Sequence, residues 1–572
     1  MSPPSRPMPS RRDVIRQLAL GAPLVLLAPA CRPLRARGTP VGGMRADLVI
    51  AGGGLGGCAA ALAACANGLR VILTEETDWI GGQLTAQAVP PDENRWIETI
   101  GGTASYRALR EAVRARYRRD YPLTAQARAR RLLNPGSGWV SRLCADPRAW
   151  LAELETLLAP HEAAGTLRIL RRHRVVAADV QGDRVRALRA QSLDTGREVV
   201  LEAPWFADAT ELGDLLPLTG TEYVVGAESR AQTGEPHAKD APESDNVQGF
   251  TVCFAMDWRP GEDHTIARPA QYDRWRAQRM RSDETAGALL LSFDDPDSRP
   301  IGFDPVARKG FWSYRRIVDR DLFARGAAGG AFDQDCTIVN WIQNDYAWGS
   351  LTEGTAADAA RHLEAARQLS LSLLYWLQVE CPRPDGGQGW RGLRLRPDVV
   401  GTADGLAKAP YIREGRRILA EATVLEQHVT LEGRMAETGA TKEAARAQSW
   451  PDSVGIGHYS MDLHVSTRGD RGRYGDTLPF QIPLGSLLPR RMENLLPACK
   501  NLGVTHLTNG CYRLHPIEWN VGEAVGHLVA LARRRGTTPR AVRHTPALLA
   551  DYQRQLEAGG IPLAWPDPLP PG

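Results

Sequence analysis

The sequence predicts an α/β fold: a Rossmann-like nucleotide-binding domain, with a central parallel sheet and a β-meander, into which an α+β substrate domain is inserted. Three observations predict it. A glycine-rich turn joins an apolar strand to a small-residue helix at residues 46–66, and strand-like alternation follows at 167–208. A second small-residue helix lies far along the chain, at 520–532. Between these stretches, residues 215–400 give few clean helical patterns.

The glycine-rich turn has the spacing of a dinucleotide-binding motif. Residues 46–57 predict a buried strand that runs into a tight turn and then into a helix. Gly52 permits the turn, Gly54 lets the backbone approach a pyrophosphate, and Gly57 lets the helix pack close to the strand. Phosphate oxygens are expected at the positive N-terminus of that helix. Glu75, eighteen residues further on at the end of the next strand, is expected to bind the ribose hydroxyls of an adenosine.

An export leader is predicted ahead of this motif. Arg11 and Arg12 form a twin-arginine signature, and the apolar run that follows, residues 18–30, is too short to span a bilayer. Residues 1–30 are therefore expected to direct export by the twin-arginine route, to the periplasm or cell envelope, which suits a protein that folds around its cofactor first. The small residues before Cys31 fit both an ordinary cleavage site and a lipoprotein site, so a lipid anchor on Cys31 stays open.

Composition and charge narrow the class of protein. The chain carries 70 basic and 66 acidic residues, and part of the excess lies in the leader, so the remaining chain is almost neutral and no nucleic-acid partner is expected. The nine cysteines include no CxxC, and no histidine–cysteine cluster has metal-ligand spacing, so no metal site is expected. Cys58 and Cys65 are expected in the core. Cys499 and Cys511 could form a disulfide, which the sequence cannot establish.

Three stretches between the glycine-rich segments have clear periodicity. Arginines at near-helical spacing mark a basic helix at 106–119, which is interpreted as a solvated face rather than an anion site: Arg107, Arg110, Arg114 and Arg118. Turn signals at 181–183 and 194–196 divide 167–208 into a β-meander. Residues 357–380 are expected to form a long amphipathic helix in the middle region. These signals predict an inserted domain between two parts of one nucleotide-binding domain.

The second small-residue helix indicates where the other end of a ligand binds. It follows a strand and turn at 495–503 and is expected to begin at 520–524, where Gly522, Ala524 and Gly526 would let a ligand approach the positive end of the helix. An N-terminal motif and a distant helix start together suggest one long cofactor that is held by both ends of the chain. This is a requirement of a flavin more than of a nicotinamide.

With these motifs the chain resembles the FAD-dependent oxidoreductases of the glutathione-reductase-like superfamily, and within it a poorly characterised, exported bacterial group. The motifs that carry the resemblance extend over most of the chain: 50–57, Glu75, 81–93, 206–215, 411–418 and 495–526. The resemblance implies FAD as the cofactor. It also implies a division into leader 1–30, linker 31–45, FAD-binding domain 46–214 and 401–535, substrate domain 215–400, and a C-terminal helix with a proline-rich tail 536–572.

The resemblance further implies roles for residues at the cofactor. The three glycines of the N-terminal motif would hold the pyrophosphate, and Glu75 the ribose. The remaining implied contacts are Gly82 and Gln83 beside the ribityl region, Ala209 and Thr210 at a second backbone approach, and Asn520, Val521 and Gly522 at the pyrimidine edge of the flavin. Glu211 stands where many relatives have glycine, which leaves the contacts there open. Glu523 is expected to point away from the flavin.

Candidates for proton handling lie just before and within the C-terminal motif: His458, His464, His506, Arg513 and His515. Arg513 would clamp an anionic substrate, since a guanidinium suits a carboxylate. A structural role stays the alternative for each histidine, and a covalent link to flavin is a further alternative for His458 and His464. The tryptophans of the middle region would either line a pocket or pack in the core: Trp312, Trp341, Trp348 and Trp390.

The expected function is hydride transfer between a small or carbohydrate-like organic substrate and flavin N5, outside the cytoplasm. One alternative is a reductase fed by an external electron donor, since the middle region shows no second GxGxxG for a nicotinamide nucleotide. Another is a non-catalytic protein stabilised by FAD. The electron acceptor stays open among oxygen, a quinone and a redox protein. A membrane contact is expected only through a lipid on Cys31.

Overall fold

The computed structural model describes residues 42–281, 287–294, 301–470 and 472–571 of the protein. The predicted export leader and Cys31 lie outside these residues, so both stay predictions. Among the helices of the described ranges, none is both long enough and apolar enough to cross a membrane.

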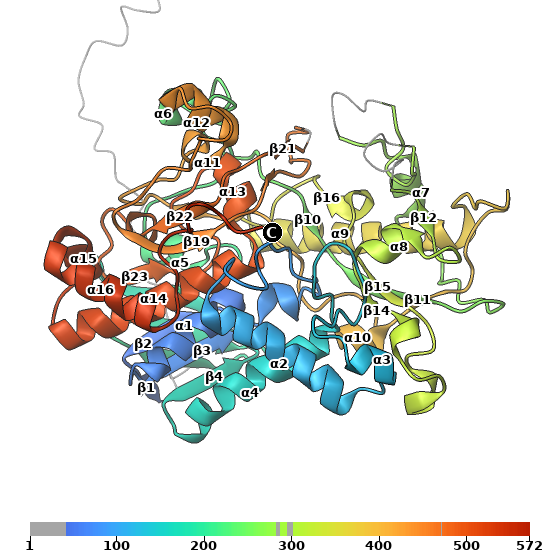
Figure 1. The fold of residues 1–572 in the computed structure, drawn as a ribbon, viewed down its shortest axis with the longest axis horizontal. Helices are drawn as coiled ribbons and strands as arrows, with labels where there is room; N and C mark the ends of the chain where they lie inside the picture. Colours follow the sequence, from blue (N-terminus) through green and yellow to red (C-terminus); the bar gives the residue numbers. More distant parts are fainter. Residues whose placement is uncertain (1–41, 282–286, 295–300, 471, 572) are drawn as a thin grey trace, which may run out of the picture. The chain divides into compact units, whose positions relative to one another are not determined.

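A parallel sheet of five strands carries the glycine-rich turn. Its strand order is β23-β8-β2-β3-β4, and every neighbouring pair is parallel. The strands are β2 (Leu48–Ala51), β3 (Val71–Glu75), β4 (Leu167–Arg171), β8 (Trp205–Asp208) and β23 (Leu495–Pro497). Strand β23, from the red end of the chain, completes a sheet that is otherwise built by blue and green segments (Figure 1). This topology confirms the predicted α/β class.

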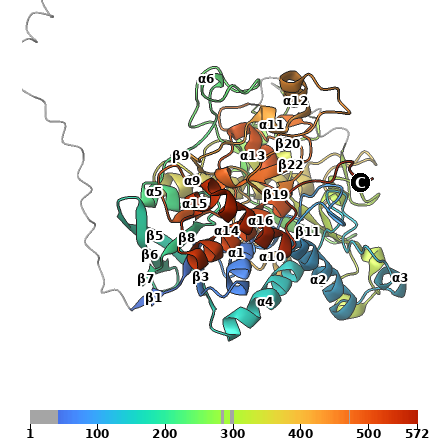
Figure 2. The ribbon, with the colours of Figure 1, turned by 60° about the vertical axis from the view of Figure 1, so that its left-hand side comes forward.

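Two helices from opposite ends of the chain pack against each other beside this sheet. They are α1 (Leu55–Ala66) and α14 (His515–Arg535), and they lie side by side in both ribbon views (Figures 1 and 2). Glycine is required where they meet, because a Cβ on Gly522 would lie 2.0 Å from the carbonyl oxygen of Gly56. The small residues of the second helix therefore serve helix packing.

The predicted start of the second helix, at 520–524, is wrong. Helix α14 begins at His515, with Leu514 as its N-cap and Pro516 in its first turn. Proline suits this place because its ring fixes a helical φ and its missing N–H group would have no partner there. The positive end of the helix therefore lies one and a half turns ahead of Asn520, Val521 and Gly522.

The predicted β-meander forms a second sheet next to the parallel one. Strands β5 (His173–Gln181), β6 (Arg184–Ser192) and β7 (Glu198–Glu202) pair antiparallel in sequence order. Strand β1 (Gly43–Arg45) adds to β7 in parallel, so that the sheet order is β1-β7-β6-β5. The turns between the three antiparallel strands lie at the glycines that the sequence indicated, Gly182 and Gly196, and both adopt positive φ.

The sequence predicted that the arginines of the basic helix form a solvated face, but two of them are buried. It is α2 (Ala104–Asp120), and on it the side chains of Arg110 and Arg114 are only 1% exposed. Arg110 lies 2.8 Å from a carboxylate oxygen of Glu93, and both arginines bind the carboxylate of Glu98, at 2.7 and 2.6 Å. The arginines are buried because two carboxylates of the preceding loop neutralise them.

The middle region has its own sheet and its own apolar core. The sheet order is β14-β15-β11-β17, with all neighbours antiparallel: β11 (Phe254–Trp258), β14 (Arg316–Val318), β15 (Cys336–Val339) and β17 (Leu393–Leu395). Helix α9 (Ala356–Val379) matches the predicted amphipathic helix. Most of the tryptophans that the sequence singled out here are buried in this core: Trp312, Trp341 and Trp390.

The remaining elements are mostly short. The two-stranded sheets are antiparallel: β9 (Tyr223–Val224) with β18 (Arg417–Ile418), β10 (Phe250–Thr251) with β16 (Asp345–Tyr346), β12 (Phe303–Asp304) with β13 (Lys309–Gly310), β19 (Ser453–Gly457) with β22 (Phe480–Pro483), and β20 (Met461–Asp462) with β21 (Tyr474–Gly475). The other α-helices are α3 (Ala125–Arg128), α4 (Pro147–Ala163), α5 (Leu215–Thr219), α6 (Arg230–Thr233), α7 (Tyr272–Ala277), α8 (Phe311–Tyr314), α10 (Pro397–Val400), α11 (Glu426–Val429), α12 (Leu431–Thr438), α13 (His506–Tyr512), α15 (Pro539–His544) and α16 (Pro546–Ala558). The 3-10 helices are η1 (Gly82–Leu84), η2 (Arg320–Leu322), η3 (Ala327–Gly330), η4 (Ile342–Asn344) and η5 (Leu484–Leu487).

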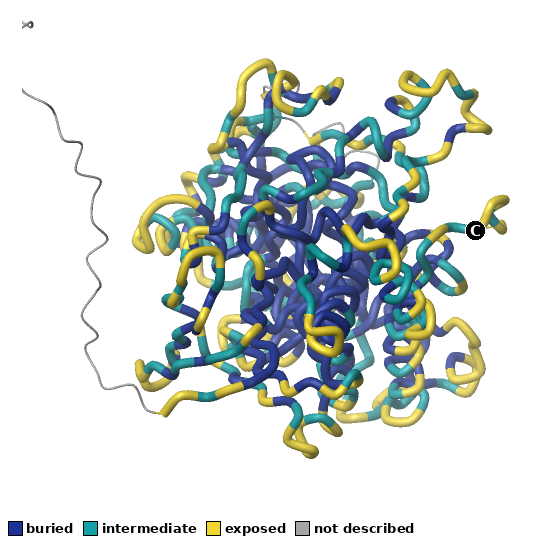
Figure 3. Tube along the Cα trace, turned by 90° about the vertical axis from the view of Figure 1, so that its left-hand side faces the viewer, coloured by how far each residue is buried: buried dark blue, intermediate teal, exposed yellow. Residues whose placement is uncertain are grey.

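The largest buried core is formed by the parallel sheet and by helices α1 and α14 beside it. The first half of α14, from His515 to Gly526, is buried throughout, and so is strand β2. Figure 3 shows the buried segments gathered in the interior of the described part of the chain, with exposed segments around them. The cysteines of the described residues are all free and buried. Cys58 and Cys65 lie on the buried face of α1, as expected, whereas Cys499 and Cys511 are separate thiols rather than a disulfide.

Candidate functional site

The glycine turn after β2 holds the sheet and helix α1 together. Gly52 has φ +96°, and a Cβ there would lie 2.2 Å from the carbonyl oxygen of Ala209, just after β8. A Cβ on Gly57 would lie 2.1 Å from the carbonyl oxygen of Gly52. Gly54 differs, because a Cβ there would first meet two side-chain carboxylates, of Glu211 at 3.2 Å and of Glu518 at 3.4 Å. The backbone of Gly54 therefore faces a space that is bounded by movable side chains.

Glu75 closes one side of this turn. Its carboxylate accepts hydrogen bonds from the backbone N–H groups of Gly53, at 3.0 Å, and Thr77, at 2.8 Å. Burial raises the pKa of this carboxyl to about 7, and the two backbone donors oppose that shift. The acid lies at the end of β3, which is the place that the sequence predicted for a ribose contact.

Gly82 and Gln83 lie on η1, against the open side of the turn. A Cβ on Gly82 would lie 2.9 Å from Cα of Gly54, so the two segments touch through their backbones. The amide nitrogen of Gln83 donates to the carbonyl oxygen of Arg513, at 3.1 Å, and to the carboxylate of Glu518. Both predicted residues therefore border the glycine turn, as do Ala209 and Thr210 from the end of β8.

The N-terminus of α1 binds an anion supplied by the protein itself. Its N-cap, Gly54, offers no side chain, so the first N–H groups of the helix need an acceptor from elsewhere. The N–H of Gly56 donates to Oε1 of Glu518 at 3.0 Å. Close by, the ammonium of Lys500 is paired with the carboxylate of Glu211. The helix terminus thus has the electrostatic character expected of a phosphate site.

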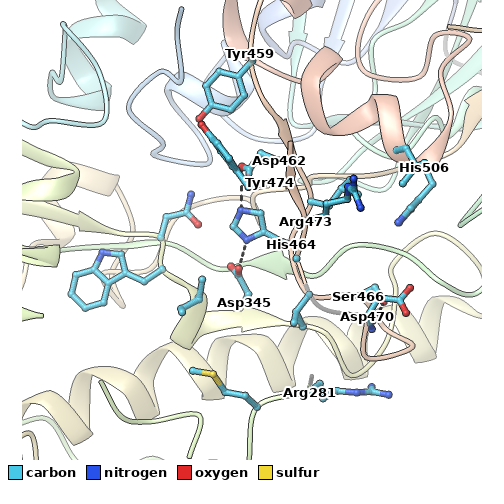
Figure 4. Close-up of a pocket in the computed structure, with 18 of the residues that line it drawn as sticks. Arg281, Asp345, Tyr459, Asp462, His464, Ser466, Asp470, Arg473, Tyr474 and His506 are labelled. Atoms are coloured by element: carbon cyan, nitrogen blue, oxygen red, sulfur yellow. Dashed lines mark hydrogen bonds and ion pairs between the residues drawn. The ribbon is translucent and has the colours of Figure 1, made fainter. Parts of the chain in front are cut away.

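A cavity of about 1160 Å³ is lined by both aromatic and charged side chains. Aromatic side chains form much of its lining: Trp139, Tyr314, Trp341, Trp348, Tyr459 and Tyr474. His464 and His506 are two of the five predicted proton-handling residues, and both line this cavity. Figure 4 shows them on the wall with Asp345, Asp462 and Arg473.

His464 is bound between two carboxylates. Its Nδ1 lies 2.5 Å from Oδ2 of Asp345 on β16, and its Nε2 lies 3.5 Å from Oδ2 of Asp462 on β20 (Figure 4). Burial and the nearby Arg413 oppose a charged imidazole, but the two carboxylates outweigh them and raise the pKa of His464. The two carboxylates therefore favour the charged imidazolium, and each ring nitrogen is directed at an acid.

Each of these carboxylates has an arginine partner on its other side. Arg413 lies 3.0 Å from Asp345, and Arg513 lies 3.1 Å from Asp462. Burial opposes the charged form of Asp345, but Arg413 and His464 together hold the pKa of its carboxyl at about 2. Because the carbonyl of Arg513 also accepts from Gln83, one chain of polar contacts connects the cavity wall to the glycine turn.

His506 belongs to a second charged group on the cavity wall. Its Nδ1 lies 2.9 Å from the carboxylate of Glu414, which also pairs with the fully buried Arg417. Burial opposes the charged form, but Glu414 raises the pKa of His506 above its ordinary value. His464 and His506 are thus both paired with acids that the sequence did not connect to them, and these acids raise the pKa of each histidine.

A model of the protein family described as FAD dependent oxidoreductase matches residues 47–556 of the chain. The protein belongs to the FAD-dependent oxidoreductase family. The match extends over both the glycine turn and helix α14, so both segments are part of the family pattern.

Solved structures of other flavoenzymes share a limited likeness with this oxidoreductase. A myxobacterial chondrochloren halogenase is 19% identical over 39% of this chain and 45% of that chain, with a TM-score of 0.21. The glycerol-3-phosphate dehydrogenase of Bacillus halodurans is 12% identical over 37% and 40%, with a TM-score of 0.22. An anhydrotetracycline hydroxylase from Streptomyces rimosus is 12% identical over 90% and 69%, with a TM-score of 0.30. The chain spans less than half of the first two proteins, and no curated protein gives a significant sequence match.

The residues near the glycine turn fit FAD. Besides the anion-binding helix end, several buried side-chain atoms of this region have no hydrogen-bond partner among the described residues, among them Gln83 Oε1, Glu211 Oε1, Arg315 Nε, Arg513 Nε and His515 Nε2. His515 Nδ1 accepts from the N–H of Asp92, and burial, with the charges of Arg315, Lys500 and Arg513, holds the pKa of His515 well below its usual range. His515 is therefore neutral with its proton on Nε2, so these five atoms comprise three donors and two acceptors. A flavin edge offers matching carbonyl, imine and N–H groups.

The other predicted catalytic residues of the oxidoreductase lie outside the cavity. Arg513 is buried and paired with Asp462 and the hydroxyl of Tyr411, at 2.7 Å, so it is not free to clamp an anionic substrate. His458 packs against Trp96, with ring centroids 5.2 Å apart. Burial and then Arg95 lower the pKa of His458 to about 4, so it is neutral and lies apart from the charged wall.

The residues assigned to the pyrimidine edge do other work. The side-chain amide of Asn520 binds β19, where it donates to the carbonyl of Val454 at 3.1 Å and accepts from the N–H of Ile456 at 3.3 Å. Val521 is fully buried and Gly522 packs on Gly56. Glu523 points away from the glycine turn, as expected, but into a buried hydrogen bond with Ser105 rather than into solvent.

Several residues of the site were not found from the sequence. Asp345, Asp462 and Arg315 come from the middle region and from β20, where no motif marks them. Glu518 and Lys500 stand inside the C-terminal motif, and their charge in an otherwise apolar stretch was the one available signal. Each becomes visible only when the fold brings it to the glycine turn or to the cavity.

Proposed function

We propose that this oxidoreductase transfers a hydride between a small or carbohydrate-like organic molecule, bound in the cavity, and N5 of FAD. The observation that carries the proposal is His464 on the cavity wall, connected through Asp462, Arg513 and Gln83 to the glycine turn. When bound, FAD supplies a two-electron acceptor, and the protein has to position the substrate and manage one proton.

His464 orients the substrate in this proposal. Its Nδ1 is bound to Asp345, but its Nε2 lies 3.5 Å from Asp462, too far for a strong hydrogen bond, so the Nε2–H group can donate to a substrate oxygen rather than remove a proton. A proton acceptor is also present, because Glu235 lines the cavity and burial raises the pKa of its carboxyl to about 7. A carboxyl with this pKa takes up and releases protons near neutral pH, which suits the substrate proton.

The aromatic lining supports a carbohydrate-like substrate. Trp139 and Tyr474 are exposed by 58% and 70%, and they lie with Tyr314 and Trp348 along the cavity. Ring faces pack against the apolar C–H faces of a sugar, while charged groups between them bind hydroxyls. The volume of the cavity also exceeds what a very small molecule would fill.

We further propose that the enzyme works outside the cytoplasm. The support is the twin-arginine signature at Arg11 and Arg12, followed by a short apolar run. A lipid on Cys31 would tether the enzyme to a membrane. Oxygen, a quinone or a redox protein would then reoxidise the flavin.

One observation favours a second function, a reductase fed by an external donor. Because His464 and His506 are each paired with acids that raise the pKa of the imidazole, both favour the protonated form and could supply a proton that a reduced substrate would take up. In this direction His464 would donate its proton to the substrate, and the flavin would receive electrons from a partner rather than from the cavity.

An anaerobic substrate screen tests these functions. Purified, yellow holoprotein is mixed with neutral sugars, sugar acids, alcohols and amino acids, and the flavin absorbance is followed before and after air is admitted. Bleaching by one class that air reverses indicates an oxidase, and bleaching that air does not reverse indicates a dehydrogenase. Bleaching only by an electron donor, with reoxidation by a cavity ligand, supports the reductase. No bleaching by any compound contradicts all three and leaves a binding role.

The cavity assignment has a matched control. His464→Gln should slow flavin bleaching at least tenfold, whereas His458→Gln, six residues earlier and outside the cavity, should leave the rate within twofold of the parent. Equal loss in both variants would show that neither effect comes from the cavity.

A further inference from the structure

Glu518 lies where FAD must bring its own negative charge. The N-terminus of α1 is the anion site of this fold, and its Gly56 N–H is bound to a carboxylate of α14. We propose that Glu518 is a placeholder for the pyrophosphate of FAD: it caps α1 while the cofactor is absent, and the cofactor displaces it. This inference depends on the family membership and is independent of the substrate proposed above.

The surroundings of Glu518 show that the place is made for an anion. The side chain is 1% exposed, and one oxygen accepts from Gly56 while the other accepts from the amide of Gln83. The same carboxylate would lie 3.4 Å from a Cβ on Gly54, the glycine whose backbone otherwise faces open space. The carboxylate therefore occupies the approach to the turn that a dinucleotide needs.

The charges at the turn cannot all stay when a pyrophosphate arrives. Glu211 and Glu518 both face the turn, with Cys499 beside them and a single ammonium, Lys500, in the group. Burial raises the pKa of Glu211, and Lys500 opposes that shift, so the group holds its carboxylate charge with difficulty already. A pyrophosphate would add negative charge to a site where one cation serves two carboxylates. Movement of Glu518 relieves the repulsion and frees Gly56.

The structure also provides a reason why the displaced side chain does not unfold the site. Glu518 loses two hydrogen bonds, from Gly56 and from Gln83, and the pyrophosphate replaces the one at the helix end with an equivalent one. Gln83 keeps its second bond, to the carbonyl of Arg513 at 3.1 Å, so η1 stays in place when Glu518 leaves. Lys500 remains in reach of the turn as the counter-charge.

Thermodynamic linkage turns this arrangement into a measurable prediction. A contact that exists only without the cofactor stabilises the free protein, and it weakens cofactor binding by the same factor. Glu518→Gln keeps a hydrogen-bond acceptor for Gly56 but removes the charge that competes with the pyrophosphate. The variant should therefore bind FAD about tenfold more tightly than the parent protein.

The experiment is an FAD titration of deflavinated protein, followed by flavin fluorescence. Glu523→Gln is the matched control, because Glu523 lies on the same helix, is similarly buried and binds Ser105 rather than the turn. We expect Glu518→Gln to lower the Kd about tenfold and Glu523→Gln to leave it within twofold. An equal or weaker affinity for FAD in Glu518→Gln would overturn the proposal, since it would mean that Glu518 assists the bound cofactor.

A second variant keeps the test decisive if Glu518→Gln does not fold. Glu518→Asp retains the charge, but its shorter side chain withdraws the carboxylate from the N–H of Gly56, so it should also bind FAD more tightly. Thermal unfolding of both forms adds an independent readout: the variant should lose stability without FAD and regain it with FAD bound. Equal loss in the two forms would show a purely structural role. A failed substrate screen would not change either result.

Discussion

Replacing Gly54 with alanine separates cofactor binding from folding at the glycine turn. Gly54 has φ −61° and ψ −175°, which any residue adopts. Its added Cβ would meet the carboxylate tips of Glu211 and Glu518, at 3.2 and 3.4 Å, and would lie at an ordinary contact distance of 3.6 Å from the carbonyl oxygen of Ala209. Gly52 is the contrasting position. It has φ +96°, and its added Cβ would lie 2.2 Å from the backbone carbonyl of Ala209, which cannot move without shifting β8.

The magnitudes follow from these geometries. Gly54→Ala should change the stability of the free protein by less than about 1 kcal/mol, because alanine also reduces the entropy of the unfolded chain by a similar amount. Gly52→Ala should cost roughly 1–3 kcal/mol for the strained φ. The backbone clash at Gly52 adds about 1–3 kcal/mol more. The effect on FAD binding has a different cause. Alanine at Gly54 blocks the approach of FAD to the backbone and should weaken FAD binding at least tenfold, about 1.4 kcal/mol.

The assay compares each variant with and without FAD. Urea unfolding of deflavinated protein reports the effect on the fold, and the absorbance spectrum of the purified protein reports retained flavin. We expect Gly54→Ala to unfold at the same urea concentration as the parent protein but to lose the yellow colour of bound flavin on purification. If Gly54→Ala keeps a full complement of flavin, or destabilises the free protein as much as Gly52→Ala does, the assignment of Gly54 to cofactor approach is wrong.

Further predictions concern the buried charges and the thiols. Glu98→Gln should destabilise the protein by about 3–5 kcal/mol in urea unfolding, because it leaves two buried arginines without their shared partner. Burial opposes the charged form of Glu98, but these arginines lower the pKa of its carboxyl to about 2. The contribution of Glu98 to folding stability is therefore present above pH 4.5 and is lost as the pH falls towards 2. A variant with the same acid sensitivity as the parent protein would contradict this. Asp345→Asn removes an acid that raises the pKa of His464, so the loss of the imidazolium proton should shift to lower pH in the pH profile of flavin bleaching, and an unmoved profile would exclude His464 as its origin. A thiol reductant should leave the thermal unfolding temperature unchanged, since Cys499 and Cys511 are unpaired, and a fall would indicate a disulfide.

The first two strands of the parallel sheet and the glycine turn between them could be predicted because their signals are local. Strand, glycines, helix and Glu75 follow one another within thirty residues, and the spacing alone fixes how they meet. The start of α14 was missed because the small residues at 522–526 looked like a ligand approach, although Pro516 marks the first turn. Their smallness serves packing against α1, which no local signal distinguishes from ligand binding.

The charged wall of the cavity could not be predicted, since its partners are far apart in sequence. His464 and Asp345 are separated by 119 residues, and His506 and Glu414 by 92. The buried arginines of α2 illustrate the same limit over a shorter distance, because Glu98 precedes Arg110 by only 12 residues but in a loop without periodicity. A histidine in a sequence gives no indication of its charge, which depends on the acids that the fold brings to it.

The pairing of α1 with α14, and of β8 with β23, has a consequence for how the enzyme matures. The first glycine turn is synthesised early, but the strand and helix that enclose it come from residues 495–535. A ribosome must therefore deliver nearly the whole chain before a site for FAD exists, and the nascent N-terminal segment has to wait with an incomplete sheet edge. Cofactor capture is then a post-translational event. Any step that depends on the assembled flavoprotein, including the proposed transport of a folded enzyme, can begin only after it.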